Sequence, residues 1–386
     1  MVEWKKLGEI GDVCMCKRIM KHQTFDKGDV PFYKIGTFGG NADAFINRDL
    51  FLEYKSKYSF PQKGEILLSA SGTIGRTIVY NGEDAYFQDS NIVWISNDET
   101  QVTNAFLYYC YHVVDWKIDG GTIKRLYNYN LKNTIIPVPS FQEQEKIVGI
   151  LDTFTSAIDN LKEQIAQRRK QYEYYRDQLL DLEGKPEVEI KTLGELSDLV
   201  TKQTGFDYSS KIKPELLKNY VEGSIPFLQT RNFNGRSFDY NTEYYVPSHV
   251  ANQFPKIVLD KECLLLSIVG SIGNVGLFPG KTKCFLGGAI CVLKFKKDIN
   301  VPYIYEVMSS WYGQRMIQSK IKGSGQATIT VEDIRNFIIP LPPLQEQQRI
   351  VSILDTFEAS IQNLEAQLEQ RQKQYEYYRN KLLTFE

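Results

Sequence analysis

The side chains that most often catalyse reactions or bind metals are few and scattered in this chain of 386 residues. The three histidines, His22, His112 and His249, are far apart in sequence and suggest no acid–base pair or metal site. Cys14 and Cys16 are the closest cysteines, and no second pair follows at the spacing of a zinc site. We therefore expect reduced thiols in the protein core, no catalytic residues and no metal.

Nucleotide-binding loops are missing as well. No G-x-G fingerprint follows a predicted strand, and residues 276–282 (GLFPGKT) place three residues between the glycines where a Walker A loop requires four. The Pro-Pro pair at 342–343 is not preceded by the Asn or Asp of an amino-methyltransferase motif. The sequence thus predicts a binding protein with no cofactor of its own.

Several glycine-rich stretches carry side chains suited to DNA contact. Residues 71–76 (SGTIGR) and 120–125 (GGTIKR) lie in the first half of the chain, and 270–274 (GSIGN) and 323–328 (GSGQAT) lie in the second. Glycine lets a loop approach a groove, polar side chains can bond to base edges, and Lys and Arg can hold phosphates. Tight turns and solvated loops are the alternative interpretation. The candidate DNA-binding residues are Lys17, Arg18, Lys21, Ser71, Thr73, Arg76, Lys124, Arg125, Arg231, Asn232, Arg236, Ser271, Asn274, Lys320, Lys322, Gln326 and Thr328.

Folded bodies must position these loops. The length predicts two or three domains, and 42% hydrophobic with 24% charged residues is typical of a globular protein. Short apolar runs bounded by Gly, Asn and Asp predict a mixed α/β fold with many short strands, and amphipathic helices are expected near 104–117 and 301–319. No run of 18 apolar residues and no signal peptide is present, which predicts a cytoplasmic protein without membrane contact.

The chain contains an internal repeat. Residues 141–183 align without gaps on 344–386, with 26 identities in 43 positions. Upstream the similarity keeps its order but is much weaker, so the bodies have diverged far more than these segments. The predicted domains are a first body at 1–140, a first long helix at 141–183, a second body at 184–343 and a second long helix at 344–386.

The two near-identical segments predict long helices with a heptad seam. Apolar residues recur at alternating steps of four and three, from Ile147 to Leu182 and again from Ile350 to Phe385. Each helix would be roughly 60 Å long, too long for a body with a radius of gyration of about 15 Å to bring the chain back. We therefore expect the helices to pair antiparallel within the chain, with one body at each end and an approximate two-fold axis. Pairing of each helix with other chains is the alternative.

A surface kept twice suggests two copies of one partner. Tyr174 and Tyr377 are expected to point away from the seam and to dock protein, although tyrosines that cover their own seam are the alternative. The two helical segments carry net charges of −3 and −2, which leaves +4 on the rest of a chain whose net charge is −1. The candidate docking residues are Gln142, Glu143, Gln144, Tyr174, Arg176, Gln345, Glu346, Gln347, Tyr377 and Arg379.

The order body, long helix, body, long helix resembles the specificity subunit of type I restriction-modification systems. The most specific features are IPVPSFQEQ at 136–144 and IPLPPLQEQ at 339–347, each followed by ILDTF, and the resemblance covers essentially the whole chain. One departure is Pro-Ser-Phe in the first copy, where the second has the more typical Pro-Pro-Leu.

The resemblance implies that each body is a target recognition domain that reads one half of a bipartite, asymmetric site in double-stranded DNA. The helices would be the spacer. It also implies two modification subunits, which bind S-adenosylmethionine and methylate adenine N6, and up to two restriction subunits, which use ATP and Mg. Catalysis would belong to these partners. Two other functions fit the residues: a stand-alone sequence-specific DNA-binding protein, and a coiled-coil scaffold with two protein-binding bodies.

Overall fold

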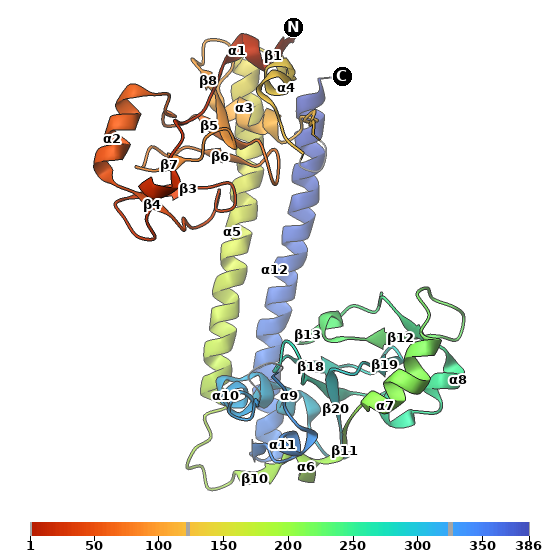
Figure 1. Ribbon diagram of the computed structural model, residues 1–386. Coiled ribbons are helices and arrows are strands. Elements are labelled where there is room, and N and C mark those ends of the chain that lie inside the picture. The colour runs from red at the N-terminus through yellow and green to blue at the C-terminus, as the bar shows by residue number, and fades with distance from the viewer. Residues whose placement is uncertain (1, 121–123, 323–326, 386) are drawn as a thin grey trace. The chain divides into compact units, whose positions relative to one another are not determined.

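The computed structural model describes residues 2–120, 124–322 and 327–385, which form two compact units (Figure 1). Unit 1 comprises Met1–Glu163 with Glu365–Glu386, and unit 2 comprises Gln164–Leu364. Each unit combines one body with a part of both long helices. The units therefore differ from the domains expected from the sequence, because helix residues contribute to the core of each body.

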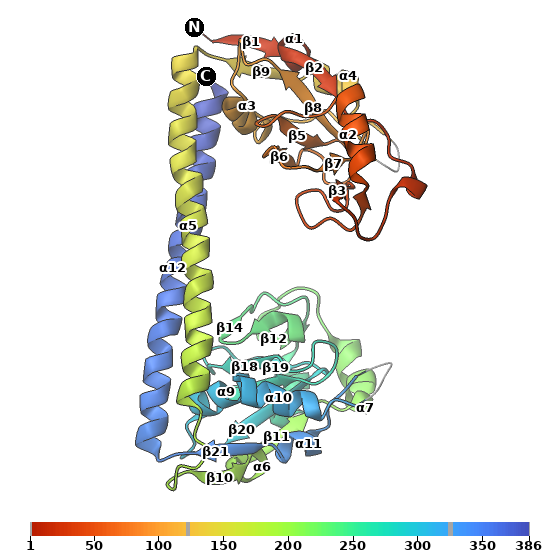
Figure 2. The ribbon, with the colours of Figure 1, turned by 90° about the vertical axis from the view of Figure 1, so that its left-hand side faces the viewer.

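Unit 1 has a four-stranded sheet in the order β2-β8-β5-β6, a three-stranded sheet β4-β3-β7 and a two-stranded ribbon β1-β9 (Figure 2). Its elements are β1 Glu3–Lys6, α1 Leu7–Ile10, β2 Gly11–Cys14, η1 Lys21–Gln23, β3 Val30–Tyr33, β4 Phe45–Ile46, α2 Arg48–Lys57, β5 Ile66–Ser69, β6 Thr77–Val79, β7 Tyr86–Phe87, β8 Ile92–Asn97, α3 Asn104–Tyr111, α4 Asn128–Asn133 and β9 Ile135–Val138.

Unit 2 repeats this plan with sheets β11-β20-β17-β18 and β15-β12-β19-β16 and with ribbons β10-β21 and β13-β14. Its elements are β10 Glu189–Thr192, α6 Leu193–Leu196, β11 Ser197–Lys202, α7 Gly205–Asp207, η2 Tyr208–Ile212, η3 Lys213–Glu215, β12 Ile225–Leu228, η4 Thr230–Asn232, β13 Phe233–Asn234, β14 Ser237–Phe238, β15 Tyr245–Val246, α8 Ser248–Ala251, η5 Pro255–Ile257, β16 Val258–Leu259, β17 Cys263–Ser267, β18 Val275–Phe278, β19 Cys284–Leu286, β20 Ile290–Phe295, α9 Val301–Ser309, α10 Trp311–Ser319, α11 Val331–Arg335 and β21 Ile338–Leu341.

The central strands are continuous apolar runs because each separates two cores. In β5, Leu68 belongs to one core of unit 1 and Leu67 to the other. In β17, Leu264 and Leu266 face one core of unit 2, and Leu265 faces the other. Successive side chains of a strand point to opposite faces, so a strand buried on both faces has no polar alternation.

The long helices are α5, Phe141–Leu179, and α12, Leu344–Thr384. In unit 1 the ring of Phe154 stacks on Tyr378 with centroids 5.3 Å apart, and in unit 2 Tyr175 stacks on Phe357 at 5.4 Å. The partner in α12 thus moves toward lower numbers as the position in α5 rises. The predicted antiparallel pairing within the chain is confirmed.

Three predicted helices differ from the structure, two at their C-terminal ends and one by a break in the middle. α5 ends at Leu179 rather than near 183, and Leu182 beyond it is 5% exposed, so the chain turns to bury this side chain. α3 ends at Tyr111, well before 117. The stretch 301–319 forms two helices, because Ser310 is extended and its side chain accepts the backbone N–H of Gly313 as the N-cap of α10.

Candidate nucleic-acid interface and docking surfaces

The same turn follows the central strand in both bodies. Ser69 Oγ donates to the carbonyl of Thr73 and accepts the backbone N–H of Arg76 at 2.9 Å. Ser267 Oγ donates to the carbonyl of Ser271 and accepts the N–H of Asn274, also at 2.9 Å. The glycines of these turns have positive φ, from +65° to +97°, a region that other residues rarely occupy.

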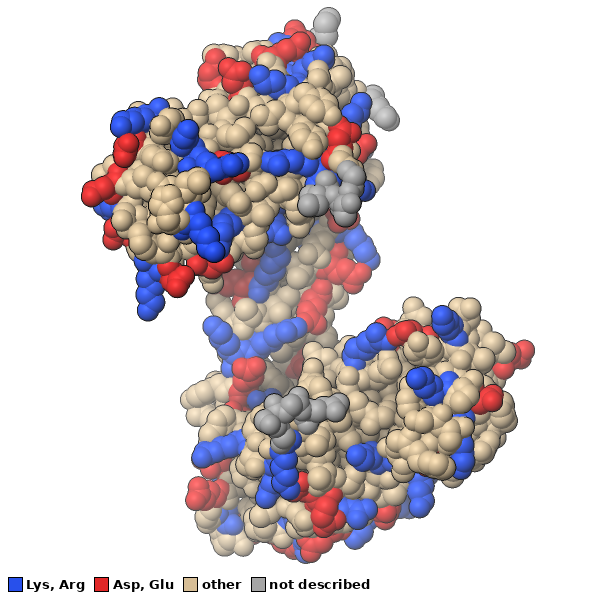
Figure 3. Space-filling view, viewed as in Figure 1, with Lys and Arg blue, Asp and Glu red and all other residues tan. Residues whose placement is uncertain are grey.

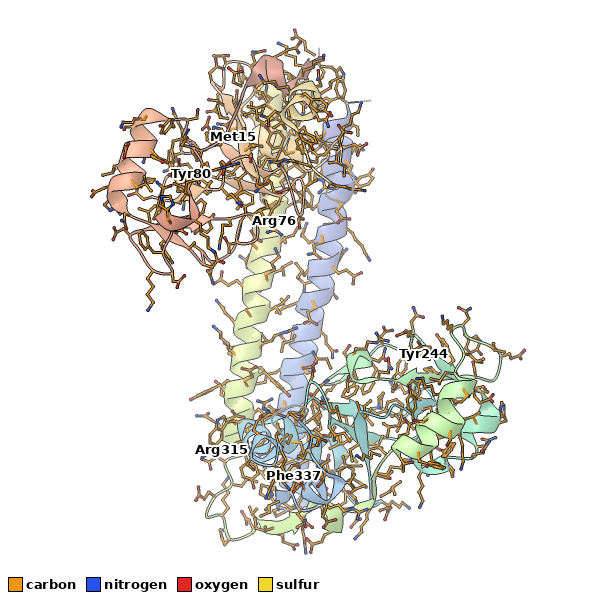
Figure 4. All side chains as sticks on the ribbon, in the orientation of Figure 1. Met15, Arg76, Tyr80, Tyr244, Arg315 and Phe337 are labelled. Carbon is orange, nitrogen blue, oxygen red and sulfur yellow. The ribbon has the colours of Figure 1, made fainter. Side chains whose placement is uncertain are left out.

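The residue after each turn bonds to an equivalent carbonyl of the neighbouring loop. Arg76, labelled in Figure 4, donates from Nη1 to the carbonyl of Phe38 at 2.7 Å, and Asn274 donates from Nδ2 to the carbonyl of Phe233 at 2.8 Å. Both side chains therefore fix the neighbouring loop to the turn through a hydrogen bond. Arg76 remains exposed and Asn274 is half-buried.

The structure brings the two glycine-rich stretches of each body together. Ser71 forms an antiparallel bridge with Arg125, and the Leu126 N–H donates to the carbonyl of Ala70 at 2.9 Å. The second body has the equivalent bridge between Val269 and Thr328. The parts of these stretches at 121–123 and 323–326, which include Gln326, lie outside the described residues.

In the first body a third loop joins this pair. Asp89 accepts from Arg18 Nε at 2.8 Å, the carbonyl of Ser90 accepts from Arg125 Nη2, and Asn91 Oδ1 accepts from Ser71 Oγ at 2.9 Å. Three predicted residues that are distant in sequence thus lie around one loop.

The other predicted residues of the first body are exposed. Lys17 lies over the ring of Tyr58, with 5.1 Å between Nζ and the centroid, and Lys21, Thr73 and Lys124 reach solvent. On the face shown in Figure 3, basic side chains are interspersed with acidic ones over each body. Phosphate contacts would therefore depend on local groups such as these rather than on a broad basic surface.

In the second body, two predicted cations are exposed but already paired. Arg231 forms an ion pair with Glu243, and Lys322 Nζ lies 3.5 Å from Asp333, with side chains 60% and 69% exposed respectively. Surface pairs of this kind are weak and can exchange for a phosphate. Ser271 and Lys320 are exposed, and Thr328 is half-buried with Oγ1 bonded to the carbonyl of Ile268.

For two predicted DNA-binding residues of the second body, the structure contradicts the prediction. Asn232 is 6% exposed, and its Oδ1 accepts the N–H of Gln229, so it closes a turn. Arg236 lies between two carboxylates, with Nη2 2.7 Å from Glu306 and Nη1 2.7 Å from Asp355. Its guanidinium is occupied within unit 2 and is not free to bind phosphate.

The group around Arg236 is a charged network that includes a fully buried carboxylate. Glu306 on α9 is fully buried and accepts from Tyr172 Oη on α5 at 2.6 Å as well as from Arg236. Burial raises the pKa of Glu306, while Tyr172 and Arg236 oppose the rise. The network joins the β13–β14 turn, α9 and both long helices within unit 2.

The seam of the long helices repeats its cation–aromatic contacts. Arg371 lies over the ring of Phe154 at 5.8 Å in unit 1, and Arg168 lies over Phe357 at 5.9 Å in unit 2. Arg176 lies over Tyr172 at 5.5 Å, and Arg379 lies over Tyr375 at 5.4 Å.

Two predicted docking glutamines are buried. Gln144 is fully buried: Nε2 donates to the carbonyls of Gln101 and Pro139, and Oε1 accepts the N–H of Thr103 at 2.9 Å. Gln347 is 8% exposed and donates to the carbonyl of Pro342 at 2.8 Å. They hold the helix starts against the bodies, so the prediction that they contact a partner is wrong.

The remaining predicted docking residues differ in how far their side chains are exposed. Tyr174 and Tyr377 are 59% and 60% exposed, and Gln142 and Gln345 also reach solvent. The Arg176 side chain is only 12% exposed because it packs on Tyr172, so it supports the seam rather than a partner surface. The half-exposed residues are Glu143, which pairs with Lys146, Glu346, which pairs with Arg349, and Arg379.

Comparison with known proteins decides the family. A family model described as the type I restriction modification DNA specificity domain matches residues 1–168 and 186–371. The chain belongs to this family. The resemblance stated from the sequence is confirmed, and so is the fold class of a mixed α/β protein with two repeated bodies and two long antiparallel helices.

Two relatives are similar in sequence, and one solved structure is similar in fold. The chain is 57% identical over 181 residues, 46% of its length, to a type I restriction enzyme specificity subunit of Haemophilus influenzae, and spans 47% of that relative. It is 33% identical over 305 residues, 75% of its length and 73% of the relative's, to the EcoR124I/EcoR124II specificity subunit of Escherichia coli. A crystal structure of the type I S subunit from M. genitalium shares the fold, with a TM-score of 0.57, 17% identity and coverage of 100% of this chain and 97% of that chain.

The sequence missed several features of this specificity-family member. The loop at 88–91, the stacked pair Tyr127 and Tyr129 and the exposed Trp4 were not singled out. The loop follows β7 and the tyrosines follow the glycine-rich stretch at 120–125, and these positions could have signalled them, but Trp4 lies within β1 and has no such signal. In the part of the chain that the structure describes, no group of His, Cys, Asp or Glu could hold a metal ion, and no helix is both long and apolar enough to span a membrane.

Proposed function

We propose that this specificity-family chain reads DNA, with each body recognising one half of a bipartite, asymmetric site. The observation that supports this proposal is the pairing of two glycine-rich loops in each body through equivalent bridges, Ser71 with Arg125 and Val269 with Thr328. The loop scaffold is the same, while the side chains on it differ: Thr73 and Arg76 in the first body correspond to Ser271 and Asn274 in the second. An identical scaffold with different polar groups fits two different half-sites.

In this proposal the chain is non-catalytic and acts in the cytoplasm as part of a larger complex. It docks two modification subunits, which supply S-adenosylmethionine and methylate adenine N6. Restriction subunits that use ATP and Mg can join them. The target adenine must leave the base stack before a partner methylates it, so the bound DNA is expected to be distorted.

Affinity is expected to depend on those partners. The net charge is −1, and the exposed cations Arg18, Arg231 and Lys322 are already paired with carboxylates. Few counterions are therefore released when the chain alone meets DNA, and binding alone should be weak. Nanomolar affinity of the isolated chain in physiological salt would contradict this expectation.

The decisive experiment is a genome-wide map of N6-methyladenine in the host, with and without the gene. Deletion should remove methylation at one bipartite motif, and exchange of residues 1–140 for those of a relative should change one half of the motif only. An unchanged map after deletion, in a strain whose modification subunit is expressed, would favour the stand-alone DNA-binding protein or the scaffold.

A matched pair of substitutions refines the test to single residues. Thr73 and Ser271 occupy equivalent exposed positions in the two turns, and their side chains are not needed for the turn hydrogen bonds, which use their carbonyls. Thr73→Ala should relax one half of the motif and Ser271→Ala the other. Ser56→Ala, exposed on α2, is the control and should leave the map unchanged.

A further inference from the structure

Two groups of exposed apolar side chains recur at equivalent positions of the two repeats. One is the tyrosine pair near the end of each long helix, Tyr174 with Tyr175 and Tyr377 with Tyr378. The other lies where each long helix begins. We name this second group the ribbon patch: Trp4, Ile135 and Phe141 in unit 1, and Ile190, Ile338 and Leu344 in unit 2.

The ribbon patch is the outer face of a two-stranded ribbon. In unit 1, β1 pairs with β9 so that Lys6 lies opposite Ile135 and Trp4 opposite Pro137, which makes Trp4 and Ile135 diagonal neighbours on one face. They are 56% and 54% exposed, whereas Ile136, on the other face, is fully buried. The ribbon therefore buries Ile136 on its inner face and leaves Trp4 and Ile135 in solvent on its outer face, beside Lys6.

Unit 2 has the same arrangement. Ile190 lies opposite Pro340 and Thr192 opposite Ile338, so Ile190 and Ile338 share the outer face, and Ile339 is buried on the inner one. Phe141 and Leu344, 45% and 51% exposed, follow as the first residues of α5 and α12. Trp has become Ile and Phe has become Leu, so apolar character is kept while the residue type changes.

Recurrence distinguishes this patch from other exposed apolar residues. Val79 is 47% exposed in unit 1, but the equivalent Leu277 of unit 2 is buried, and the exposed Tyr129 corresponds to Glu332. Single exposed apolar side chains are ordinary on protein surfaces and need no partner. An apolar group kept in both copies, on bodies that otherwise diverged, indicates a contact made twice.

The charges beside the patch favour protein over DNA. On the strands, Lys5 pairs with Glu3 at 2.9 Å and Lys191 with Glu189 at 3.3 Å, and both pairs lie on the other face of the ribbon from the patch. At the helix starts, Lys146 lies 3.8 Å from Glu143 and Arg349 lies 2.7 Å from Glu346. Lys6, opposite Ile135, adds one positive charge in the first repeat, where the second repeat has the neutral Thr192. A surface that binds phosphates carries an excess of positive charge, whereas an apolar centre with a balanced polar rim is typical of a protein interface.

We propose that each ribbon patch docks an apolar surface of one modification subunit. This inference rests on the proposed function, in which that subunit is the partner present twice. It assigns the contact to Trp4, Ile135 and Phe141 and to their counterparts, which the sequence did not single out, and it replaces the buried Gln144 and Gln347. The exposed Gln142 and Gln345 continue the surface along each helix.

The second patch borders a hollow that the partner can fill. Ile190 and Pro340 line a cavity of 920 Å³ together with Trp311, Tyr312 and Asp181. Trp311 is 60% exposed with Arg315 over its ring. A side chain of the modification subunit that enters this hollow would be desolvated on several sides, so we expect the second patch to bind more tightly than the first.

The test uses the full chain and the modification subunit encoded with it. Phe141→Glu and Leu344→Glu each place a carboxylate at the first residue of a long helix, where the helix dipole favours negative charge, so both variants should fold. Native mass spectrometry of the mixture should show two modification subunits on the wild type, one on either variant and none on the double variant. The affinity of the altered site should fall by about tenfold or more.

Controls separate the possible failures. Phe206→Glu alters a side chain that is 75% exposed but lies outside the patch, and it should retain two modification subunits. Trp4→Glu combined with Ile135→Glu should reproduce the loss from the ribbon itself, with an unchanged melting temperature. If all these variants still bind two subunits, the docking inference is wrong and the proposed function stands. If the wild type binds none, the proposed function fails.

Discussion

In unit 1 the body meets the long helices through a tyrosine, whereas in unit 2 it meets the equivalent helix residues through an arginine and a buried glutamate. Tyr109 on α3 donates from Oη to Asp152 on α5. The counterpart of Asp152 is Asp355 on α12, which accepts from Arg236 at 2.7 Å. The position of Tyr109 is taken by Glu306, which binds the other side of the same guanidinium.

The helix residues at the two junctions are the same, and the body residues are not. Asp152 and Asp355 occupy one position of the repeated helix, and Tyr375 and Tyr172 occupy another. Tyr375 packs against the core of unit 1, while Tyr172 donates to Glu306 in unit 2. One helix surface can therefore carry bodies of different chemistry, provided that each body presents a donor to the aspartate.

The largest difference between the junctions should appear on removal of the Arg236 charge. Arg236→Met keeps the apolar stem but leaves Glu306 fully buried without its cation, and this should lower the free energy of unfolding by about 3–5 kcal/mol. Urea unfolding read by hydrogen exchange in unit 2 measures the loss. Arg231→Met, which removes an arginine that is 60% exposed, is the control and should cost about 1 kcal/mol or less. Equal losses would show that burial of Glu306 does not matter.

The loss in Arg236→Met should also depend on pH. Burial raises the folded-state pKa of Glu306 above its unfolded value, so the stability tied to the protonated carboxyl is present in acid and lost as the pH rises through the folded-state pKa. Without Arg236, which lowers the pKa of Glu306, burial raises this pKa further. The deficit relative to the wild type should therefore be smaller near about pH 5 than near about pH 8. Adding Glu306→Gln to the variant should remove the pH dependence, and a deficit that grows in acid would refute the assignment.

The sequence predicts the helices well and the junctions poorly, for a physical reason. A heptad seam is local and periodic, so Ile147, Leu151 and Ile158 identify themselves, and all three are buried. Arg236 in a loop has the composition of a phosphate-binding residue. Its carboxylate partners are 70 and 119 residues away, and no local pattern links them.

In the loops, too, the local structure is predictable from the sequence and the long-range contacts are not. Their glycine content predicts close turns, and the positive φ values bear this out, but the bridge between Ser71 and Arg125 joins stretches that only the tertiary fold brings together. Gln144 is a similar case, because a glutamine at a helix start is predicted from the sequence to be exposed. It is buried because the carbonyl of Pro139, five residues away, and that of Gln101, 43 residues away, satisfy its amide N–H groups.

The helix starts offer a second comparison of the repeats. Gln144→Leu should cost about 3 kcal/mol, because the carbonyls of Gln101 and Pro139 and the N–H of Thr103 lose a partner in a buried site. Gln347→Leu, which removes the bond to Pro342, should cost about 1 kcal/mol. Chemical unfolding of the two variants in parallel measures the difference, and a larger loss for Gln347→Leu would reverse the comparison.

The smallest expected difference is between the tyrosines that donate to a carboxylate at the two junctions, Tyr172 and Tyr109. Tyr172→Phe removes a donor from the fully buried Glu306 and should cost about 2 kcal/mol, because a buried charged acceptor regains no water in exchange. Tyr109→Phe removes a donor from Asp152, which is exposed and can be solvated instead, so about 1 kcal/mol is expected. Thermal unfolding of the two single variants gives the ordering. If Tyr109→Phe proved the more costly, the first junction rather than the second would hold its body more tightly to the shared helices.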